Sequence, residues 1–168
     1  MKRLFVSFLI VLSALNGCAR NLISDRSLAQ ADRSISFNDL LKNPDAYRGK
    51  MVIIGGGIAG VTRLKDGSQI EVIQYDLDTR QMPVDYSASG GRFLAFLPES
   101  LNESINISSC KRGMLVSLAG KVTGKKVLQL KGADYTYPTI TISEINIIKT
   151  VNEDTLRTWE PPEGAQGF

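Results

Sequence analysis

The fold is decided by residues 51–60, which read Met51-Val52-Ile53-Ile54-Gly55-Gly56-Gly57-Ile58-Ala59-Gly60. Gly55, Gly57 and Gly60 follow a β-branched run and match G-x-G-x-x-G, a pattern typical of dinucleotide-binding enzymes. That motif holds pyrophosphate at the N-terminus of a helix, so a helix should follow the last glycine. Here residues 61–64 are strand-like, and Lys65-Asp66-Gly67 is a hairpin signal. We therefore expect the glycines to bend a strand or to admit a neighbouring backbone, and we expect no dinucleotide.

The remainder of the chain contains short runs of alternating or β-branched residues that predict strands. We expect strands at residues 51–64, 69–75, 92–97, 114–122, 127–130 and 136–149. Turns are expected at Asp66-Gly67 and at residues 124–126. A short helix is expected over residues 36–41, because Ser36 is a good N-cap and Pro44 ends the pattern. The predicted fold is mainly β: a small, partly closed β-barrel of the oligonucleotide/oligosaccharide-binding (OB) type, with one short N-terminal helix and a cleaved signal peptide before it.

The N-terminus has the layout of a bacterial lipoprotein leader. Met1-Lys2-Arg3 is followed by an apolar run over residues 4–15, and Leu15-Asn16-Gly17-Cys18 has the form of a lipobox. A membrane-spanning helix needs about 20 apolar residues, and this run is shorter. We predict cleavage after Gly17 and a lipid on Cys18; the alternative is a leader that is retained as an anchor.

These patterns divide the chain into four segments. They are a lipoprotein signal peptide (residues 1–17), a lipid-anchored tether (18–34), a β-barrel domain (35–150) and a flexible C-terminal tail (151–168). The tether is polar and has no steady period, and as a flexible coil its 15 or so residues would span on the order of 20 Å. The domain is therefore expected to lie close to the membrane.

The composition excludes several classes of function. The formal net charge is +3, but loss of Lys2 and Arg3 with the leader leaves 18 basic and 17 acidic residues, so no nucleic-acid partner is expected. The chain has no histidine, which excludes Ser-His-Asp and Cys-His catalysis and makes a catalytic zinc site improbable. We expect no enzyme: no catalytic residue, no metal ligands and no cofactor other than the lipid on Cys18. Cys110 is then left without a partner in the chain and is expected to be partly buried; an intermolecular disulfide is the alternative.

Three residues are candidates for binding a ligand. Arg92 carries a planar guanidinium suited to phosphate or carboxylate, although it is expected to pair with an acid such as Asp85. Tyr135 and Tyr137 stand at alternate positions and therefore face the same way. They form a stacking patch for a ligand or cover one end of the barrel. Asp76 and Asp78 are expected to be solvated loop residues.

Several motifs of the chain resemble the Slp family, the starvation-inducible outer-membrane lipoproteins of Gram-negative bacteria. The resemblance begins at the leader and Cys18 and is strongest in the motifs Pro44-Asp45-Ala46-Tyr47-Arg48-Gly49-Lys50, Gly91-Arg92-Phe93 and Tyr135-Thr136-Tyr137-Pro138. It implies a lipid-anchored domain at the outer membrane, most simply on its periplasmic face. Ala19, in place of Asp after the lipidated cysteine, is consistent with that membrane.

The expected function is that of a non-enzymatic outer-membrane lipoprotein with a role in envelope maintenance or stress. The expected partners are the membrane, through the lipid, and an envelope protein or polymer. The alternative function is a periplasmic lipoprotein that binds a small ligand or an oligosaccharide on the face formed by Arg92, Tyr135 and Tyr137.

Overall fold

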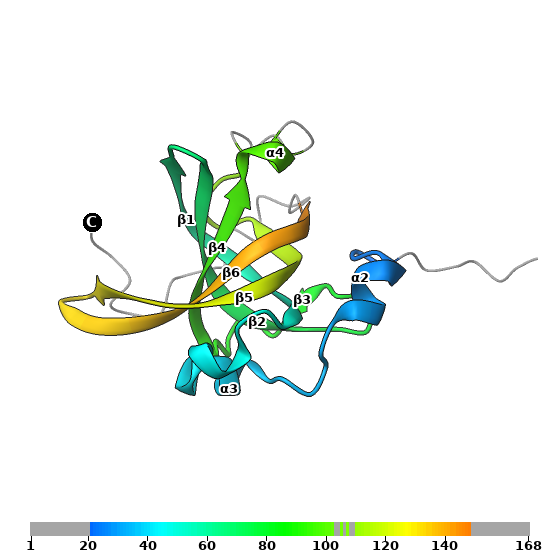
Figure 1. Cartoon of the computed structure of the whole chain (residues 1–168), viewed down its shortest axis with the longest axis horizontal. Helices are drawn as coiled ribbons and strands as arrows, with labels where there is room; N and C mark the ends of the chain where they lie inside the picture. Colours follow the sequence, from blue (N-terminus) through cyan, green and yellow to red (C-terminus); the bar gives the residue numbers. More distant parts are fainter. Residues whose placement is uncertain (1–20, 103–104, 106, 108–109, 149–168) are drawn as a thin grey trace, which may run out of the picture.

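Six strands and several short helices make up the part of the chain that the computed structural model describes, residues 21–102, 105, 107 and 110–148 (Figure 1). The helices are α2 (Asp25–Gln30), α3 (Phe37–Lys42), the 3₁₀-helix η2 (Pro44–Tyr47) and α4 (Glu99–Asn102). The strands are β1 (Met51–Leu64), β2 (Gly67–Leu77), β3 (Pro83–Val84), β4 (Gly91–Pro98), β5 (Leu115–Leu130) and β6 (Ala133–Ile148).

Five of the strands close into a barrel. The sheet runs in the order β1-β5-β6-β4-β2-β3, and β1 also pairs with β2. Closure between β4 and β6 is parallel and consists of three residue pairs, at residues 94–96 and 139–141, whereas the other barrel pairings are antiparallel. This topology confirms the predicted OB-like barrel.

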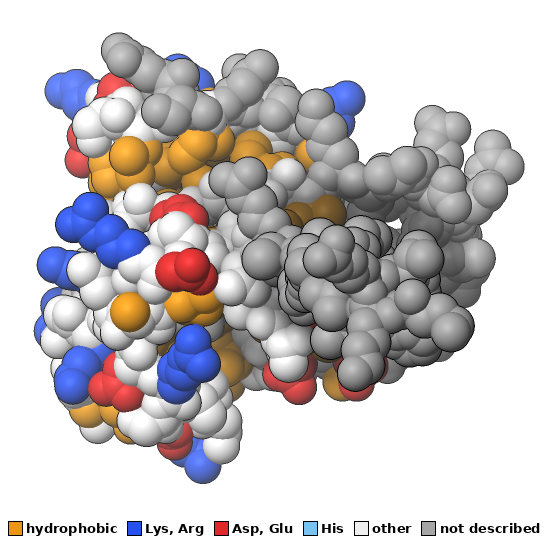
Figure 2. All heavy atoms as spheres, turned by 90° about the vertical axis from the view of Figure 1, so that its right-hand side faces the viewer, with side chains coloured by type: hydrophobic (Ala, Val, Ile, Leu, Met, Phe, Trp, Pro, Cys, Tyr) orange, Lys and Arg blue, Asp and Glu red, His pale blue; other side chains and the backbone are white. Residues whose placement is uncertain are grey.

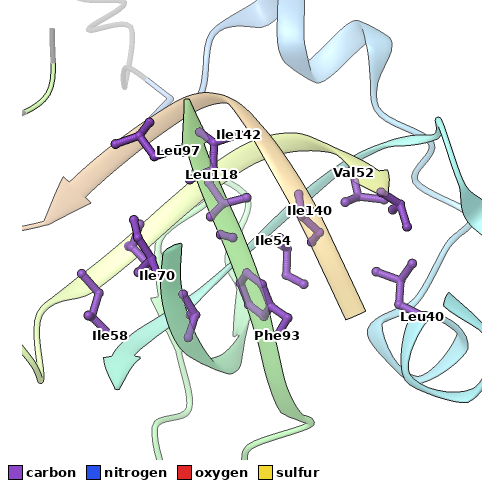
Figure 3. Close-up of a cluster of buried hydrophobic side chains, with 14 of the residues drawn as sticks. Leu40, Val52, Ile54, Ile58, Ile70, Phe93, Leu97, Leu118, Ile140 and Ile142 are labelled. Carbon is purple, nitrogen blue, oxygen red and sulfur yellow. The ribbon is translucent and has the colours of Figure 1, made fainter. Parts of the chain in front are cut away.

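Apolar side chains fill the interior of the barrel. Phe93, Ile70, Leu118 and Ile140 are almost completely buried, and they meet in one cluster that draws on β1, β2, β4, β5 and β6 (Figure 3). Burial of each such side chain contributes roughly 1.5–3 kcal/mol. Because strand residues alternate between two faces, Glu71 and Arg92, the neighbours of Ile70 and Phe93, point to the outer surface.

Helix α3 packs against one end of the barrel. Ser36 accepts a hydrogen bond from the Asp39 N–H while the Asp39 carboxylate accepts from the Ser36 N–H, so the predicted N-cap forms a capping box. Leu40 is buried in the core, and the rings of Phe37 and Phe93 lie 6.1 Å apart. The helix ends at Lys42, before Pro44, as the sequence predicts.

The glycines of the decisive stretch lie inside strand β1 and not at a strand-to-helix turn. The strand continues through Gly60 to Leu64, with a register shift between Ile58 and Gly60. At residues 55–57 it pairs with β5 on one side and with β2 on the other. A Cβ on Gly56 would lie 1.8 Å from the carbonyl oxygen of Ile73, so close approach of backbones requires glycine here. The predicted structural role of the glycines is confirmed.

The second predicted turn is not where the sequence pattern puts it. Strand β5 continues through Gly124 to Leu130, and the chain reverses at Lys131 and Gly132, which both have positive φ (53° and 82°). Gly124 instead marks a register shift against β6, where the Arg48 guanidinium leaves no space for a side chain. The result is a long two-stranded arm that extends beyond the barrel (Figure 1).

The structure also differs from the expected tether. Residues 25–30 form helix α2, which is capped by Ser24, and Ile23 is completely buried. The sequence did not predict this helix. A helix of six residues is not stable by itself, and its stability comes from contacts with the barrel that a local pattern does not reveal. Among the described residues no helix is long and apolar enough to cross a membrane.

Candidate functional site

The predicted ligand-binding residues lie together on the outer face of the barrel. Arg92 belongs to β4, and Tyr135 and Tyr137 belong to β6. Glu71 of β2, which the sequence analysis did not single out, completes the cluster; it alternates with Ile70 and Val72, which point into the core. The neighbouring positions of β2, β4 and β6 in the closed sheet bring these four side chains together.

Glu71 is the centre of this cluster. Arg92 Nη1 donates to Glu71 Oε1 over 2.8 Å, and the Tyr137 hydroxyl donates to the same oxygen over 3.0 Å. Arg92 therefore pairs with an acid, as expected, but the acid is Glu71 and not Asp85. Asp85 accepts from the Ser87 hydroxyl within its own loop. In the register between β2 and β4, Arg92 stands opposite Ile73, and Glu71, two residues away on β2 and on the same face, is its diagonal neighbour.

The two tyrosines differ in environment although they stand on one face. Their rings lie 4.6 Å apart in an edge-to-face arrangement, which confirms the predicted common orientation. The Tyr135 hydroxyl accepts from the Arg92 N–H over 2.8 Å, and a Cβ on Gly91 would lie 2.6 Å from that hydroxyl. Gly91-Arg92 and the Tyr-x-Tyr element thus form one local unit, in which Gly91 leaves room for the Tyr135 hydroxyl.

Tyr137 is held in its neutral form. Its side chain is 3% exposed, and burial, followed by the nearby Glu71 carboxylate, raises the pKa of Tyr137 to about 12. The phenol therefore acts as a hydrogen-bond donor at physiological pH.

The cluster satisfies much of its own bonding capacity. The Arg92 and Glu71 side chains are 21% and 29% exposed, and each neutralises the other. An anionic ligand would have to compete with Glu71 for the guanidinium. The arrangement suits a structural tie across three strands and leaves the partly exposed Tyr135 ring for contact with a neutral partner.

A groove under the N-terminal segment is a second candidate site. One hollow of about 400 Å³ is lined by Leu28, Ile35, Val52 and Gln81, and an adjoining hollow of about 170 Å³ shares Ile35 and Val52. Gln81 Oε1 is buried and has no hydrogen-bond partner among the described residues. Sequence reasoning did not find this groove, because one of its walls is the segment that was expected to be an irregular tether.

Asp78 and Cys110, two further residues that the sequence analysis considered, have structural surroundings. Asp78 accepts from the N–H groups of Arg80 and Met82 and so shapes its own loop. Cys110 is a free, half-buried thiol, and burial raises its pKa. Within the described ranges no three Cys, Asp or Glu side chains are grouped to hold a metal ion. Cys18 lies outside the described residues, so its lipidation stays a prediction.

Comparisons with solved structures find distant similarity of shape. A mitochondrial single-stranded DNA binding protein from S. cerevisiae is 12% identical, with 62% of this chain and 99% of that chain covered and a TM-score of 0.43. A small single-stranded DNA-binding protein from Streptomyces coelicolor is 16% identical, with 59% and 94% covered and a TM-score of 0.38. An OBody bound to hen egg-white lysozyme is 17% identical, with 62% and 85% covered and a TM-score of 0.41. At these values no ligand is inferred for this chain.

Comparison of the sequence with protein families gives a more specific result than the comparison of structures. A search of curated proteins found no match. Residues 15–164, however, match the model of one protein family, and this range includes Cys18 and the whole barrel. The predicted family is thereby confirmed, and the match includes Gly91-Arg92-Phe93 and Tyr135-Thr136-Tyr137-Pro138; residues 1–14 of the leader lie outside it. The chain belongs to the outer membrane lipoprotein Slp family.

Proposed function

We propose that the protein is held at the outer membrane by a lipid on Cys18 and serves the cell envelope without catalysing a reaction, in envelope maintenance or stress. The observation that carries this proposal is the family match over residues 15–164, which begins three residues before Cys18. The proposal includes removal of the signal peptide over residues 1–17 and a domain that faces the periplasm.

The geometry of the barrel supports a binding role over a catalytic one. The interior is filled by apolar side chains. On the outer face, Arg92 and Tyr137 both donate hydrogen bonds to Glu71. The chain has no histidine that could act as a base at neutral pH. The proposed partner is an envelope protein or polymer that contacts the outer face around Tyr135.

Metabolic labelling with radioactive palmitate tests the anchor. The wild-type protein and the Cys110→Ser variant should both incorporate label and fractionate with outer membranes. Cys18→Ser should incorporate no label and should be lost from the outer-membrane fraction. Label in Cys18→Ser equal to that in the wild type would contradict the anchor.

A second candidate function, binding of a small ligand or oligosaccharide, is favoured by the groove and by the unpartnered Gln81 Oε1 that lines it. We would titrate the protein with chitohexaose and follow backbone amide signals by NMR. Shifts confined to the groove, and abolished by Ile53→Phe, would support this function there. Shifts at Arg92 and Tyr135 would favour the outer face instead, and no shift in either place would count against binding of this oligosaccharide.

A further inference from the structure

Residues only a few positions after the proposed lipidation site already contact the barrel. The Leu22 N–H donates to the carbonyl oxygen of Arg80 over 3.1 Å, and the Leu22 carbonyl lies 3.4 Å from Asn146 Nδ2. Ile23, the next residue, is completely buried. The chain is thus attached to the barrel from residue 22 onward, and not from residue 35.

Glu144 of β6 fixes the start of helix α2 to the barrel. Its Oε1 accepts from the Ser24 N–H over 2.8 Å, and its Oε2 accepts from the hydroxyls of Ser24 and Ser27 over 2.7 and 2.5 Å. Charge-assisted bonds of this kind are stronger than bonds between neutral groups. The carboxylate also lies where the dipole of a helix favours negative charge.

The far end of the same segment is attached as well. The Asp32 N–H donates to the Met51 carbonyl over 2.8 Å, and the Asp32 carboxylate accepts from Lys50 Nζ over 3.2 Å. Contacts therefore hold residues 22–32 at both ends, against β6 and against β1.

These contacts limit how far the domain can lie from the lipid. Four peptide units separate Cys18 from Leu22, and even fully extended they span at most about 14 Å. A free tether over residues 18–34 would reach about 55 Å when extended. The docking of residues 22–32 accounts for the difference.

The direction of the barrel follows from the position of α2. Figure 1 shows α2 near one end of the long axis and the tip of the β5–β6 arm at the other. We propose that the lipid on Cys18 holds the α2 end of the barrel against the membrane surface and directs the β5–β6 arm away from it, toward partners in the adjoining compartment. This inference rests on the proposed lipid anchor.

The surface chemistry is consistent with an orientation set by the tether. Figure 2 looks onto the side that carries α2, where basic, acidic and hydrophobic side chains are interspersed on the described residues. The part of this side that is in view therefore shows no predominance of one charge that would bind it to an anionic bilayer. The arm exposes Val127 (51%) together with Lys126 and Lys131, whereas Lys125 pairs with Asp45 over 3.2 Å.

Energy transfer to labelled lipid tests the orientation. The full-length, lipidated protein would carry Cys110→Ser, so that a fluorophore reacts only with Arg26→Cys on α2 or with Val127→Cys on the arm. Both variants would be inserted into vesicles of phosphatidylethanolamine and phosphatidylglycerol with acceptor-labelled headgroups. Because the tether is short, transfer from position 26 should be at least about twofold more efficient than transfer from position 127. Equal or reversed efficiencies in vesicle-bound protein would overturn the inference.

Two further variants separate the possible failures. Cys18→Ser protein that still binds vesicles would contradict the anchor, which is the proposed function, and not the orientation. For this test the first label is moved from α2 to the barrel, at the exposed Thr79→Cys beside the Arg80 carbonyl that Leu22 contacts. Glu144→Ala frees α2 and lengthens the tether, so the difference between positions 79 and 127 should shrink; Ser143→Ala, its exposed neighbour on β6, should leave the difference unchanged. The double variant Ser24→Ala, Ser27→Ala provides the same test if Glu144→Ala does not fold. A difference that persists in these variants would show that the docking of α2 does not set the orientation.

Discussion

Gly55 and Gly56 lie where strand β1 pairs with two neighbours at once. A Cβ on Gly55 would lie 2.5 Å from the Val116 carbonyl oxygen, and one on Gly56 would lie 1.8 Å from that of Ile73. Gly60, in contrast, has open space: the nearest atom to a Cβ there is a Glu71 carboxylate oxygen at 4.0 Å. The glycines that the sequence motif groups together therefore have different structural roles.

This difference gives a matched pair of substitutions. Gly56→Ala should lower the free energy of unfolding by about 3 kcal/mol, because two strands must move apart to admit the methyl group. Gly60→Ala should change it by less than about 0.5 kcal/mol. Urea denaturation followed by circular dichroism measures both. Similar losses in the two variants would contradict the assigned close approach.

Tyr137 gives the barrel a dependence on alkaline pH. The pKa of its hydroxyl is raised from 10.0 to about 12, so the folded state favours the neutral phenol more than the unfolded state does. This contribution to stability is complete below pH 10 and is lost as the pH rises from about 10 to about 12. Urea midpoints should therefore fall over that range. In Tyr137→Phe this part of the fall should be absent, and an unchanged pH profile in that variant would refute the assignment.

At the scale of the elements, helix α2 shows how a short helix can depend on its surroundings. It has six residues, which is too few for stability in isolation. Its N-cap, Ser24, and its buried Ser27 both donate to Glu144, which comes 120 residues after Ser24 in the chain. Burial raises the pKa of Glu144, but the hydrogen bonds from Ser27 and Ser24 outweigh this effect and leave the pKa below its ordinary value.

Glu144→Ala should release α2 without unfolding the barrel. Amides of residues 25–30 should exchange with solvent at least about tenfold faster, because charge-assisted bonds contribute roughly 1.5–3 kcal/mol each. The melting temperature of the barrel should change little. In the wild type, docking should persist above the ordinary pKa of 4.5 and be lost as the pH falls through the lowered pKa of Glu144. Hydrogen exchange measured by mass spectrometry reports both effects, and Ser143→Ala is the control.

At the scale of the whole molecule, one hydrophobic core includes side chains of the barrel and of helix α3. Phe93 is completely buried, and its ring meets that of Phe37 on α3 as well as the apolar side chains of the barrel. The β4 strand that carries Phe93 also makes the three-pair parallel closure with β6. Packing around Phe93 thus supports both closure of the sheet and docking of α3.

Phe93→Ala should lower the free energy of unfolding by about 3–5 kcal/mol, the range for loss of a buried aromatic side chain. Phe96→Ala provides the control on the same strand, because Phe96 is only half-buried and should cost less than half as much. Chemical denaturation of both variants gives the comparison. Equal losses of unfolding free energy in the two variants would show that Phe93 contributes no more to stability than the half-buried Phe96.

Local patterns of the sequence were sufficient for most of the fold. The alternation of residues predicted β1, β2, β4 and the inner half of β5, Asp66-Gly67 predicted the β1–β2 hairpin, and Ser36 predicted the start of α3. The lipobox, Gly91-Arg92-Phe93 and the Tyr-x-Tyr-Pro element led to the family. These signals work because a period of two, a cap and a turn each depend on residues only a few positions apart.

The sequence by itself thus determined the class of fold, the family and the common face of Tyr135 and Tyr137. Only the tertiary structure decided that Arg92 pairs with Glu71, that Gly124 lies in a bulge and that α2 is docked through Glu144. The physical reason is the same in each case. These contacts join strands and helices from distant parts of the chain, and the register and closure of the barrel bring them together, which no local pattern specifies.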